Sequence, residues 1–261
     1  MKRIIALILV VVMAIASLVS CGTAGEDLER VKENGKLVVG VTVYKPMDYY
    51  DENGAWTGFD AELAQEFAKK LGVECELVII NWDRKVAELR SKQIDLVWNG
   101  MTATDKLGKK IDFSVSYAKN AQVAVVKKGS ALTKDTVASA NIAVEGGSAG
   151  ATVAEETIKG TKINKVTAMV DALNEVLSGA SEVAIVDITM AQSVVGKGAY
   201  ADLEILEGAS YGDEIFAVGL RRGSNLKAEL DAFLKAKYKD GSLAALAEKY
   251  SVGLNTEALG E

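Results

Sequence analysis

The chain has 261 residues and a net charge of −6, with no histidine and two cysteines. An acidic balance without basic blocks argues against nucleic-acid binding and against a polybasic membrane-surface role. Without histidine, the usual ligands of zinc sites and the usual base of Ser-His-Asp triads are missing, whereas chemistry carried by carboxylates alone stays open.

The first twenty residues are predicted to be a secretory signal peptide. Lys2 and Arg3 precede an apolar run over 4–19, which is the order typical of such a signal. A membrane-spanning helix needs about 20 apolar residues, so this shorter run favours a cleaved signal. An uncleaved anchor is the alternative.

The apolar run closes with Leu18-Val19-Ser20-Cys21 and is followed by small residues up to Gly25. This pattern resembles the lipobox of bacterial lipoproteins, in which the cysteine is lipidated and becomes the new N-terminus. The resemblance implies that residues 21–25 form a lipidated tether and that Cys21 anchors the protein to the outer face of the bacterial membrane, since two acyl chains suffice for stable anchoring. An ordinary cysteine near a cleavage site is the alternative.

Short β-branched runs alternate with helical patterns along the rest of the chain, which predicts α/β layers with mainly parallel sheets. The clearest helix is predicted over 59–71, because apolar residues recur four apart and a glycine follows. A second helix is predicted over 83–92 with Asp83 as its N-cap, and the tail over 256–261 is expected to fray. Strands are predicted over 36–42, 76–80, 94–98, 122–126, 142–145, 182–186 and 215–220, and further helices over 149–158, 170–177, 188–195, 226–238 and 243–250.

Several motifs, taken in order and with their spacing, resemble one protein family. They are Tyr44-Lys-Pro-Met-Asp-Tyr49, Gly58-Phe-Asp-Ala-Glu-Leu63, Asn81-Trp-Asp83, Ile94-Asp-Leu-Val-Trp-Asn-Gly-Met-Thr-Ala-Thr-Asp105, Ile111-Asp-Phe-Ser114, Gly147-Ser-Ala-Gly150 and Val186-Asp187. With these motifs the chain is similar to the bacterial extracellular solute-binding proteins of family 3, the amino-acid-binding type.

That resemblance implies a type 2 periplasmic-binding-protein fold, with two lobes joined by two hinge strands. It assigns residues 26–120 and 215–255 to one lobe and 121–214 to the other. Hinge closure around a ligand is a known kind of conformational change. Polar breaks in the sequence near 119–121 and 211–214 are compatible with these boundaries.

The resemblance also implies a function. The chain is expected to be a monomeric substrate-binding component of an ABC transporter, which captures an amino acid or a related amine by cleft closure and delivers it to a membrane permease. No cofactor and no enzymatic activity are expected. Because function must be argued from the site, a dehydratase or lyase using Glu145 and Asp187 for acid–base chemistry, and a secreted sensory module, remain alternatives.

Two aromatic residues and one polar turn are candidate ligand contacts on the predicted first lobe. The resemblance implies that Tyr44 and Trp82 pack on the ligand, and aromatic rings can clamp an aliphatic solute or attract an ammonium group. Core packing is the alternative for both. Asn99, Gly100 and Thr102 follow a strand end, where open α/β sheets bind ligands, although a plain polar turn would use the same residues.

Three residues of the predicted second lobe complete the candidate site. Ser148 and Ala149 lie at the start of a predicted helix, where free backbone N–H groups can receive an acceptor, and a plain glycine-rich turn is the alternative. Asp187 ends an apolar strand, where the resemblance implies a partner for the ligand's ammonium group. Its alternative role is the N-cap of the following helix.

The main departure from the family pattern is Leu107. Amino-acid-binding members carry at this position an arginine that binds the ligand's α-carboxylate, so either another cation replaces it or the ligand differs. A buried carboxylate without a partner would cost several kcal/mol. Arg84, two residues after Trp82, is the first candidate for the substitute cation, and Lys45 and Lys106 are the others. A solvated surface charge is the alternative for Arg84.

The lipid anchor is directly testable. We expect Cys21→Ser to release the protein from membranes, because the acylated side chain is lost. Fractionation of cells expressing either form, followed by immunoblotting, measures this release. A Cys21→Ser protein that stays in the membrane fraction like the parent would contradict the anchor.

Overall fold

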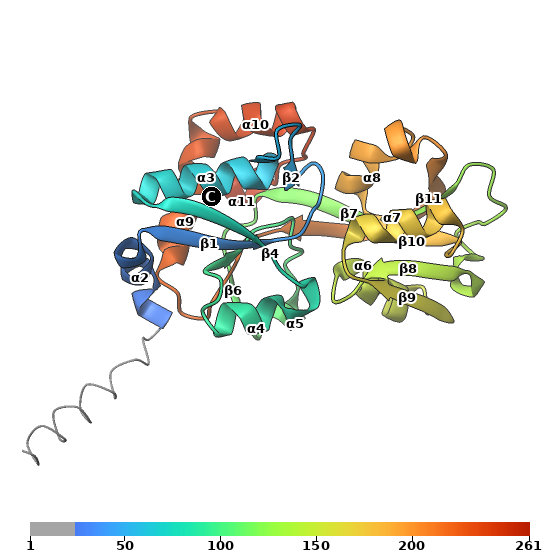
Figure 1. Cartoon of the computed structure of the whole chain (residues 1–261), viewed down its shortest axis with the longest axis horizontal. Coiled ribbons are helices and arrows are strands. Elements are labelled where there is room, and N and C mark those ends of the chain that lie inside the picture. The colour runs from blue at the N-terminus through green and yellow to red at the C-terminus, as the bar shows by residue number, and fades with distance from the viewer. Residues whose placement is uncertain (1–23) are drawn as a thin grey trace, which may run out of the picture.

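The computed structural model describes residues 24–261, so the predicted signal peptide and Cys21 lie outside the described residues. Two α/β lobes lie side by side and are joined by long strands (Figure 1), which confirms the two-lobed α/β fold class predicted from the sequence. Within residues 24–261 no helix is long and apolar enough to cross a membrane.

The first lobe is built on a five-stranded sheet in the order β4-β1-β5-β12-β6, in which β1, β4 and β5 are parallel and β12 is antiparallel to its neighbours. Helix α3 lies on one side of this sheet and α4 on the other (Figure 1). The strands are β1 Lys36–Val41, β4 Glu74–Ile79, β5 Leu96–Val97, β6 Asp112–Phe113 and β12 Gly219–Leu220, and the hairpin β2 Tyr49–Tyr50 and β3 Trp56–Thr57 stands beside the sheet. The helices are η1 Ala24–Glu26, α2 Asp27–Asn34, α3 Phe59–Leu71, η2 Trp82–Arg84, α4 Lys85–Arg90, α5 Asp105–Gly108, α9 Leu226–Lys239, α10 Ser242–Tyr250 and α11 Thr256–Gly260.

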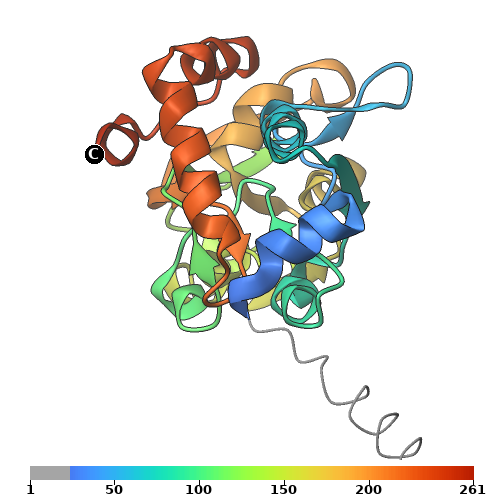
Figure 2. The same ribbon diagram turned by 90° about the vertical axis from the view of Figure 1, so that its left-hand side faces the viewer.

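Helix α3 has the bounds predicted from its periodicity. Phe59, Leu63 and Phe67 recur every four residues and are fully buried, because residues four apart share one face of a helix. The helix ends at Gly72, whose φ of 77° is a backbone conformation that glycine adopts without strain. At the outer end of the lobe α2 meets α9 (Figure 2), where the Leu28 amide donates to the Asn225 side chain at 2.8 Å.

The second lobe is built on a five-stranded sheet in the order β11-β7-β10-β8-β9. Strands β8, β9 and β10 are parallel, and β7 is antiparallel to both of its neighbours. The strands are β7 Ala118–Lys127, β8 Asn141–Glu145, β9 Lys162–Val166, β10 Val183–Asp187 and β11 Leu203–Phe216, and the helices are η3 Val137–Ser139, α6 Ala149–Thr152, its π-helical continuation η4 Val153–Thr157, α7 Met169–Ser178, α8 Ile188–Val194 and η5 Gly198–Tyr200.

Strands β7 and β11 run from one lobe into the other (Figure 1) and pair with each other over their whole length. Asn120 and Glu214, which flank the predicted lobe boundaries, lie opposite each other in this pair. Two irregularities in the register interrupt β11 between Ile205 and Asp213, and such bulges bend a strand. The two connections therefore form one two-stranded hinge.

Three expectations about single elements were wrong. Asp83 is not an N-cap, because the Asn81 side chain accepts the Asp83 amide and α4 begins only at Lys85. The expected frayed tail is the short helix α11, which packs against α9 through the buried Leu259. The predicted strand at 215–220 is divided between the end of β11 and β12.

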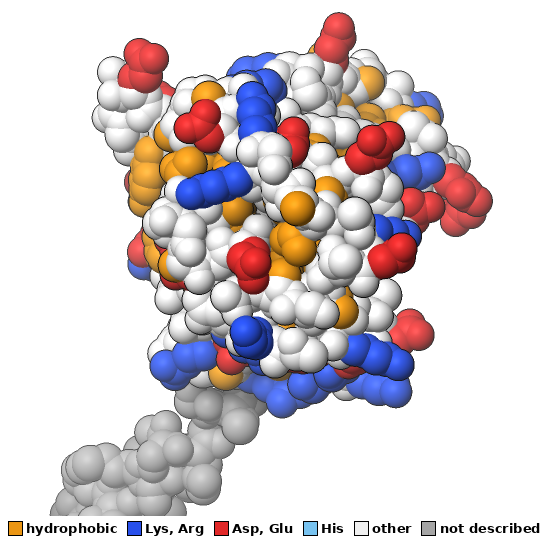
Figure 3. Space-filling model, turned by 90° about the vertical axis from the view of Figure 1, so that its right-hand side faces the viewer, with side chains coloured by type: hydrophobic (Ala, Val, Ile, Leu, Met, Phe, Trp, Pro, Cys, Tyr) orange, Lys and Arg blue, Asp and Glu red, His pale blue; other side chains and the backbone are white. Residues whose placement is uncertain are grey.

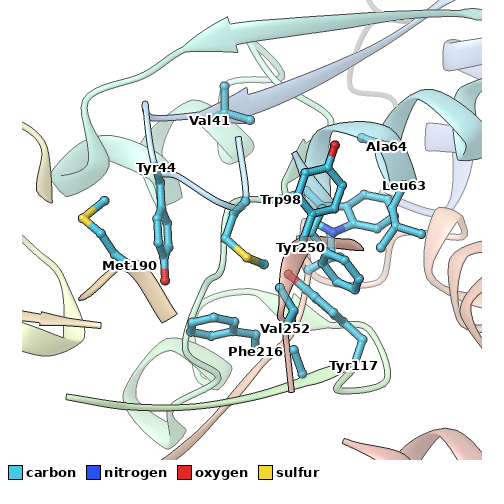
Figure 4. Close-up of a cluster of buried hydrophobic side chains, with 14 of the residues drawn as sticks. Val41, Tyr44, Leu63, Ala64, Trp98, Tyr117, Met190, Phe216, Tyr250 and Val252 are labelled. Carbon is cyan, nitrogen blue, oxygen red and sulfur yellow. The ribbon is translucent and has the colours of Figure 1, made fainter. Parts of the chain in front are cut away.

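The largest cluster of buried side chains spans both lobes. Figure 4 shows Tyr44 lying between Met190 of α8 and the first-lobe residues Phe216 and Trp98. On the outer end of the second lobe, acidic and basic side chains are interspersed with small hydrophobic areas (Figure 3). The extended apolar cluster therefore lies in the interior of the two lobes, and this outer face carries only small hydrophobic areas.

Arg221 ties together four segments of the first lobe. Its Nε donates to both Asp27 oxygens at 3.1 and 2.9 Å, and its Nη2 donates to Asp95 at 3.1 Å. Its Nη1 donates to the carbonyl oxygens of Leu89 and Ile94. All three charged side chains are nearly inaccessible to water. The partly exposed Arg30 also pairs with both carboxylates, but Arg221 is their buried partner, so they depend mainly on its guanidinium for compensation.

We expect Arg221→Ala to lower the free energy of unfolding by about 3–5 kcal/mol, because it leaves two buried carboxylates without their main partner. Urea unfolding followed by circular dichroism measures the change. The exposed neighbour Arg222, which donates to the Gly108 carbonyl at 3.0 Å, is the matched control, and Arg222→Ala should cost under about 1 kcal/mol. Equal losses in the two variants would contradict the role of Arg221.

Candidate functional site

A cavity of about 290 Å³ lies between the lobes. It is bounded by the segments that follow β1, β4 and β5 on one side and β8 and β10 on the other. In each lobe these are the carboxyl ends of parallel strands, where α/β sheets place their ligands. The lining includes all the predicted site residues except Arg84, namely Tyr44, Trp82, Asn99, Gly100, Thr102, Ser148, Ala149 and Asp187.

Two aromatic side chains form apolar walls of the cavity. Tyr44 is buried and its hydroxyl donates to Asp187 Oδ2 across the lobes at 2.8 Å. Trp82 is also largely buried, and Lys85 Nζ lies 4.6 Å from its ring centroid. The Trp82 ring therefore attracts the Lys85 ammonium group and holds it beside the cavity.

The turn after β5 is held rigidly from beneath. The Asn99 side chain accepts from the amide and hydroxyl of Thr42 and donates to the Thr42 carbonyl and to Asp48. Gly100 donates its amide to Asp60 at 2.6 Å, and a Cβ on this glycine would lie 2.7 Å from the Tyr44 ring. These groups shape the cavity wall, and their hydrogen-bonding capacity is largely used within the first lobe.

Asp48 and Asp60 form a buried acidic pair under this turn. Burial raises the pKa of Asp60 to about 7. Burial and the nearby charge of Asp60 raise the pKa of Asp48 as well. Two neighbouring carboxylates in a dry site favour keeping a proton, since both cannot ionise without strong repulsion. The two carboxyl groups beneath the turn therefore stay partly protonated near pH 7.

Asp187 is directed into the cavity and is not a helix cap. It precedes α8, but its side chain makes no capping hydrogen bond within the described chain. Instead it accepts from Tyr44 and from the Gln122 side chain. Burial, with a smaller contribution from the charge of Glu214, raises the pKa of Asp187 to about 7. A cationic partner would restore its ionised form.

Ser148 and Ala149 open the second-lobe helix beside the cavity. The Ser148 hydroxyl accepts from the Ala151 amide at 3.1 Å, so this side chain caps α6. Thr102, on the facing lobe, donates its hydroxyl to Glu214 at 3.0 Å. Both hydroxyls therefore already have protein partners, and Ala149 offers only its backbone and methyl group.

Lys85, and not the predicted Arg84, is the buried cation of the described cavity lining, and the predicted candidate Lys106 lines the cavity at its exposed rim. Arg84 is exposed and does not line the cavity, because η2 turns its side chain to the outside. Lys85 is 4 % exposed and donates to the carbonyl oxygens of Trp82 at 3.0 Å and Gly147 at 2.9 Å. Burial lowers the pKa of Lys85 to about 8, against the opposing charges of Glu145 and Asp83.

Glu145 is a cavity residue that we did not predict as a ligand contact. It is the last residue of β8 and is 3 % exposed. Burial and the charge of Asp187 raise the pKa of Glu145 to about 8, although Lys85 and the Met169 backbone act in the opposite direction. The signal in the sequence was an acidic residue closing an apolar strand, the pattern that also marks Asp187.

The lobes are in direct contact around the cavity. A Cβ on Gly147 would lie 2.9 Å from Asp83 Cα, which belongs to the opposite lobe. The Lys85 bond to the Gly147 carbonyl and the Tyr44 bond to Asp187 also cross between lobes. This arrangement encloses the cavity and corresponds to a closed state.

Comparison with known proteins places these features in context. Residues 37–253 match the family model of the bacterial extracellular solute-binding proteins, family 3. An L-cystine-binding protein of Escherichia coli is 34 % identical over 229 residues, which cover 85 % of each chain.

Two solved structures share the fold over most of this chain. An ABC uptake transporter substrate-binding protein from Streptococcus pneumoniae with bound histidine is 28 % identical, with a TM-score of 0.80, and covers 87 % of this chain and 97 % of its own. An ancestral amino acid-binding protein, a precursor of cyclohexadienyl dehydratase, is 31 % identical, with a TM-score of 0.78 over 85 % of this chain and 98 % of its own.

We expect Gly147→Ala to hinder closure, because the new methyl group would overlap Asp83 and the φ of 70° disfavours a side chain. Small-angle X-ray scattering with bound solute should give a larger radius of gyration than for the wild type. Gly146→Ala is the control, since its Cβ would meet neighbours only at 3.6 Å or beyond. If Gly147→Ala closes as fully as Gly146→Ala, the lobe contact does not limit closure.

Proposed function

Because the chain belongs to family 3 of the bacterial extracellular solute-binding proteins, we propose that it captures an amino acid or a related amine for an ABC transporter. Relatives that match most of this chain include an L-cystine-binding protein and a substrate-binding protein with bound histidine. The observation that carries the proposal is the cavity between the lobes, which is lined by the buried Asp187 carboxylate and by the aromatic side chains of Tyr44 and Trp82.

The proposed mechanism is binding followed by lobe closure. In an open state the solute would meet Trp82 and the turn at Asn99 on one lobe. Rotation about β7 and β11 would then bring Asp187 and Ser148 over it and form the Tyr44 and Lys85 bonds between lobes. The closed surface is what a permease could distinguish from the open one, since a ligand shifts the equilibrium by its differential affinity for the two states.

The missing arginine restricts the ligand chemistry. Leu107 lies in the cavity wall, where amino-acid-binding relatives are expected to bind a carboxylate. Lys85 is the group best placed to replace that arginine, because its ammonium is at the cavity and already enclosed. An ammonium group binds a carboxylate as a point charge rather than as a planar fork, so the recognition would be less directional.

We further propose that the protein acts as a monomer tethered outside the cytoplasm through Cys21 and that it delivers its ligand to a membrane permease. Support comes from the lipobox-like sequence before Gly22 and from the family membership. The described part of the chain supplies no helix able to cross a membrane, so a lipid tether would hold the lobes at the membrane surface.

A lyase or dehydratase remains the second candidate. Glu145 and Asp187 are two buried acids with raised pKa values at one cavity, and one structural neighbour is the precursor of a dehydratase. We propose binding without turnover. Proton NMR of a solute incubated with the protein should show the solute unchanged, whereas conversion into a product would favour the enzyme.

We expect Asp187→Asn to weaken an amine-bearing ligand by about 2–5 kcal/mol, the cost of removing one member of a buried charge pair. Isothermal titration calorimetry against amino acids and amines measures the loss. Asp83→Asn is the matched control, because Asp83 also lines the cavity but is exposed, and a rim charge should change affinity by under about 1 kcal/mol. Unchanged binding by Asp187→Asn would remove this residue from the site.

A further inference from the structure

Glu145 is a buried acid without a full set of partners. Its Oε1 is shielded from solvent and has no hydrogen-bond partner among residues 24–261. Within the same part of the chain Glu145 forms no ion pair, since Lys85 donates instead to Trp82 and Gly147. A buried acceptor without a donor costs free energy, and Glu145 lines the cavity, so a cationic group of a bound solute would supply the donor that this carboxyl group lacks.

The buried charges at the cavity form a specific set. Three charged side chains of the described lining are less than one-tenth exposed: Lys85, Glu145 and Asp187. The other charged side chains in this lining lie at the exposed rim, and two of them, Glu155 and Lys165, pair with each other at 2.7 Å. With both acids ionised, the buried set carries a net charge of −1, which favours a ligand of net charge +1.

The two acids offer separate binding points. Glu145 and Asp187 end the neighbouring parallel strands β8 and β10, and each has a different protein partner. Asp187 is held by Tyr44 and Gln122, while Glu145 lies toward Lys85 and the start of α7. One ammonium group cannot neutralise both acids fully, so the site is matched to two cationic groups on one molecule.

Lys85 supplies the complementary charge for an anion. An ammonium group has three N–H donors, and carbonyl oxygens of Trp82 and Gly147 use two of them. The third can donate to a ligand carboxylate. Two acids and one ammonium group together mirror the charges of an amino acid with a cationic side chain.

We infer that Glu145 is a second ligand-binding carboxylate and that the cavity recognises a basic amino acid, whose two cationic groups bind Asp187 and Glu145 and whose carboxylate binds Lys85. The inference rests on the proposed solute-binding function and names its substrate class. Glu145 is then the residue that distinguishes ligands with a cationic side chain from ligands with a neutral one.

Calorimetry with three probes tests this assignment: L-lysine, L-norleucine, which has the same four-carbon side chain without the ε-ammonium group, and cadaverine, which lacks the carboxylate. The wild type should bind L-lysine at least about 30-fold more tightly than L-norleucine, as expected for one buried charge pair. Cadaverine should bind at least about tenfold more weakly than L-lysine, because Lys85 would lose its partner.

Glu145→Gln should abolish most of the selectivity. The loss for L-lysine should be at least about 30-fold, while L-norleucine should change by less than about threefold, because only the ε-ammonium group loses its counter-charge. Glu156→Gln is the matched control, because Glu156 is exposed and lies outside the described cavity lining, and it should preserve the wild-type ratio. Thermal unfolding of Glu145→Gln should give a melting temperature no lower than that of the wild type, since a neutral side chain of similar shape replaces a buried acid whose ionised form burial disfavours.

The outcomes distinguish a failure of the basic-amino-acid assignment from a failure of the proposed solute-binding function. A wild type that binds L-norleucine as tightly as L-lysine, or cadaverine as tightly as L-lysine, overturns the basic-amino-acid assignment but leaves solute binding intact. An unchanged lysine-to-norleucine ratio in Glu145→Gln overturns the role of Glu145. A wild type that binds none of the three probes and none of the standard amino acids contradicts the proposed function, and this inference with it.

Discussion

Charges buried between the two lobes must find partners there, and this constraint organises the closed structure. Asp187 is balanced by hydrogen bonds from Tyr44 and Gln122, and Lys85 by two carbonyl oxygens and an aromatic face. Two of these interactions form only when the lobes meet. Closure therefore encloses the ionisable groups and strengthens every electrostatic interaction at the cavity, because water no longer screens them.

Buried polar groups that bond to one another also support the wall of the cavity from the core of the first lobe. Beneath the cavity wall, Asp60 holds the Gly100 amide and Asn99 bridges Thr42 and Asp48. These polar groups are buried and mutually bonded, so the turn cannot shift without breaking several hydrogen bonds at once. A rigid wall on one lobe and a hinge of two paired strands let the other lobe move as a unit.

Much of the fold was predictable because it depends on local patterns. The four-residue spacing of Phe59, Leu63 and Phe67 gave the bounds of α3, and the apolar runs gave β1, β8 and β10 within about two residues. Strand β9 was missed because the only apolar residues of Lys162–Val166 are Ile163 and Val166, three positions apart, so the period-two pattern of a strand is absent, and the segment is mostly exposed at a sheet edge. The first half of β11 was missed since glycines and acids interrupt it.

The site was predictable only in part. Tyr44, Trp82 and Asp187 were predicted because the family resemblance implies ligand contacts at these positions, just after or at the end of apolar strands, and all three line the cavity. The choice between Arg84 and Lys85 could not be made from sequence, because it depends on how the single turn η2 rotates successive side chains. Glu145 was noted as an acid but not as a ligand contact, since its missing partner is visible only in three dimensions.

The central claim is that an amine-bearing solute binds between the lobes. Calorimetric titration of the wild type without residues 1–20, at neutral pH against the standard amino acids and simple diamines, tests it most directly. We predict one-to-one binding by at least one solute that carries an amino group, with the tightest binding by a solute of net positive charge. Failure of every such solute to bind, together with binding by an uncharged sugar or a dicarboxylic acid, would contradict it.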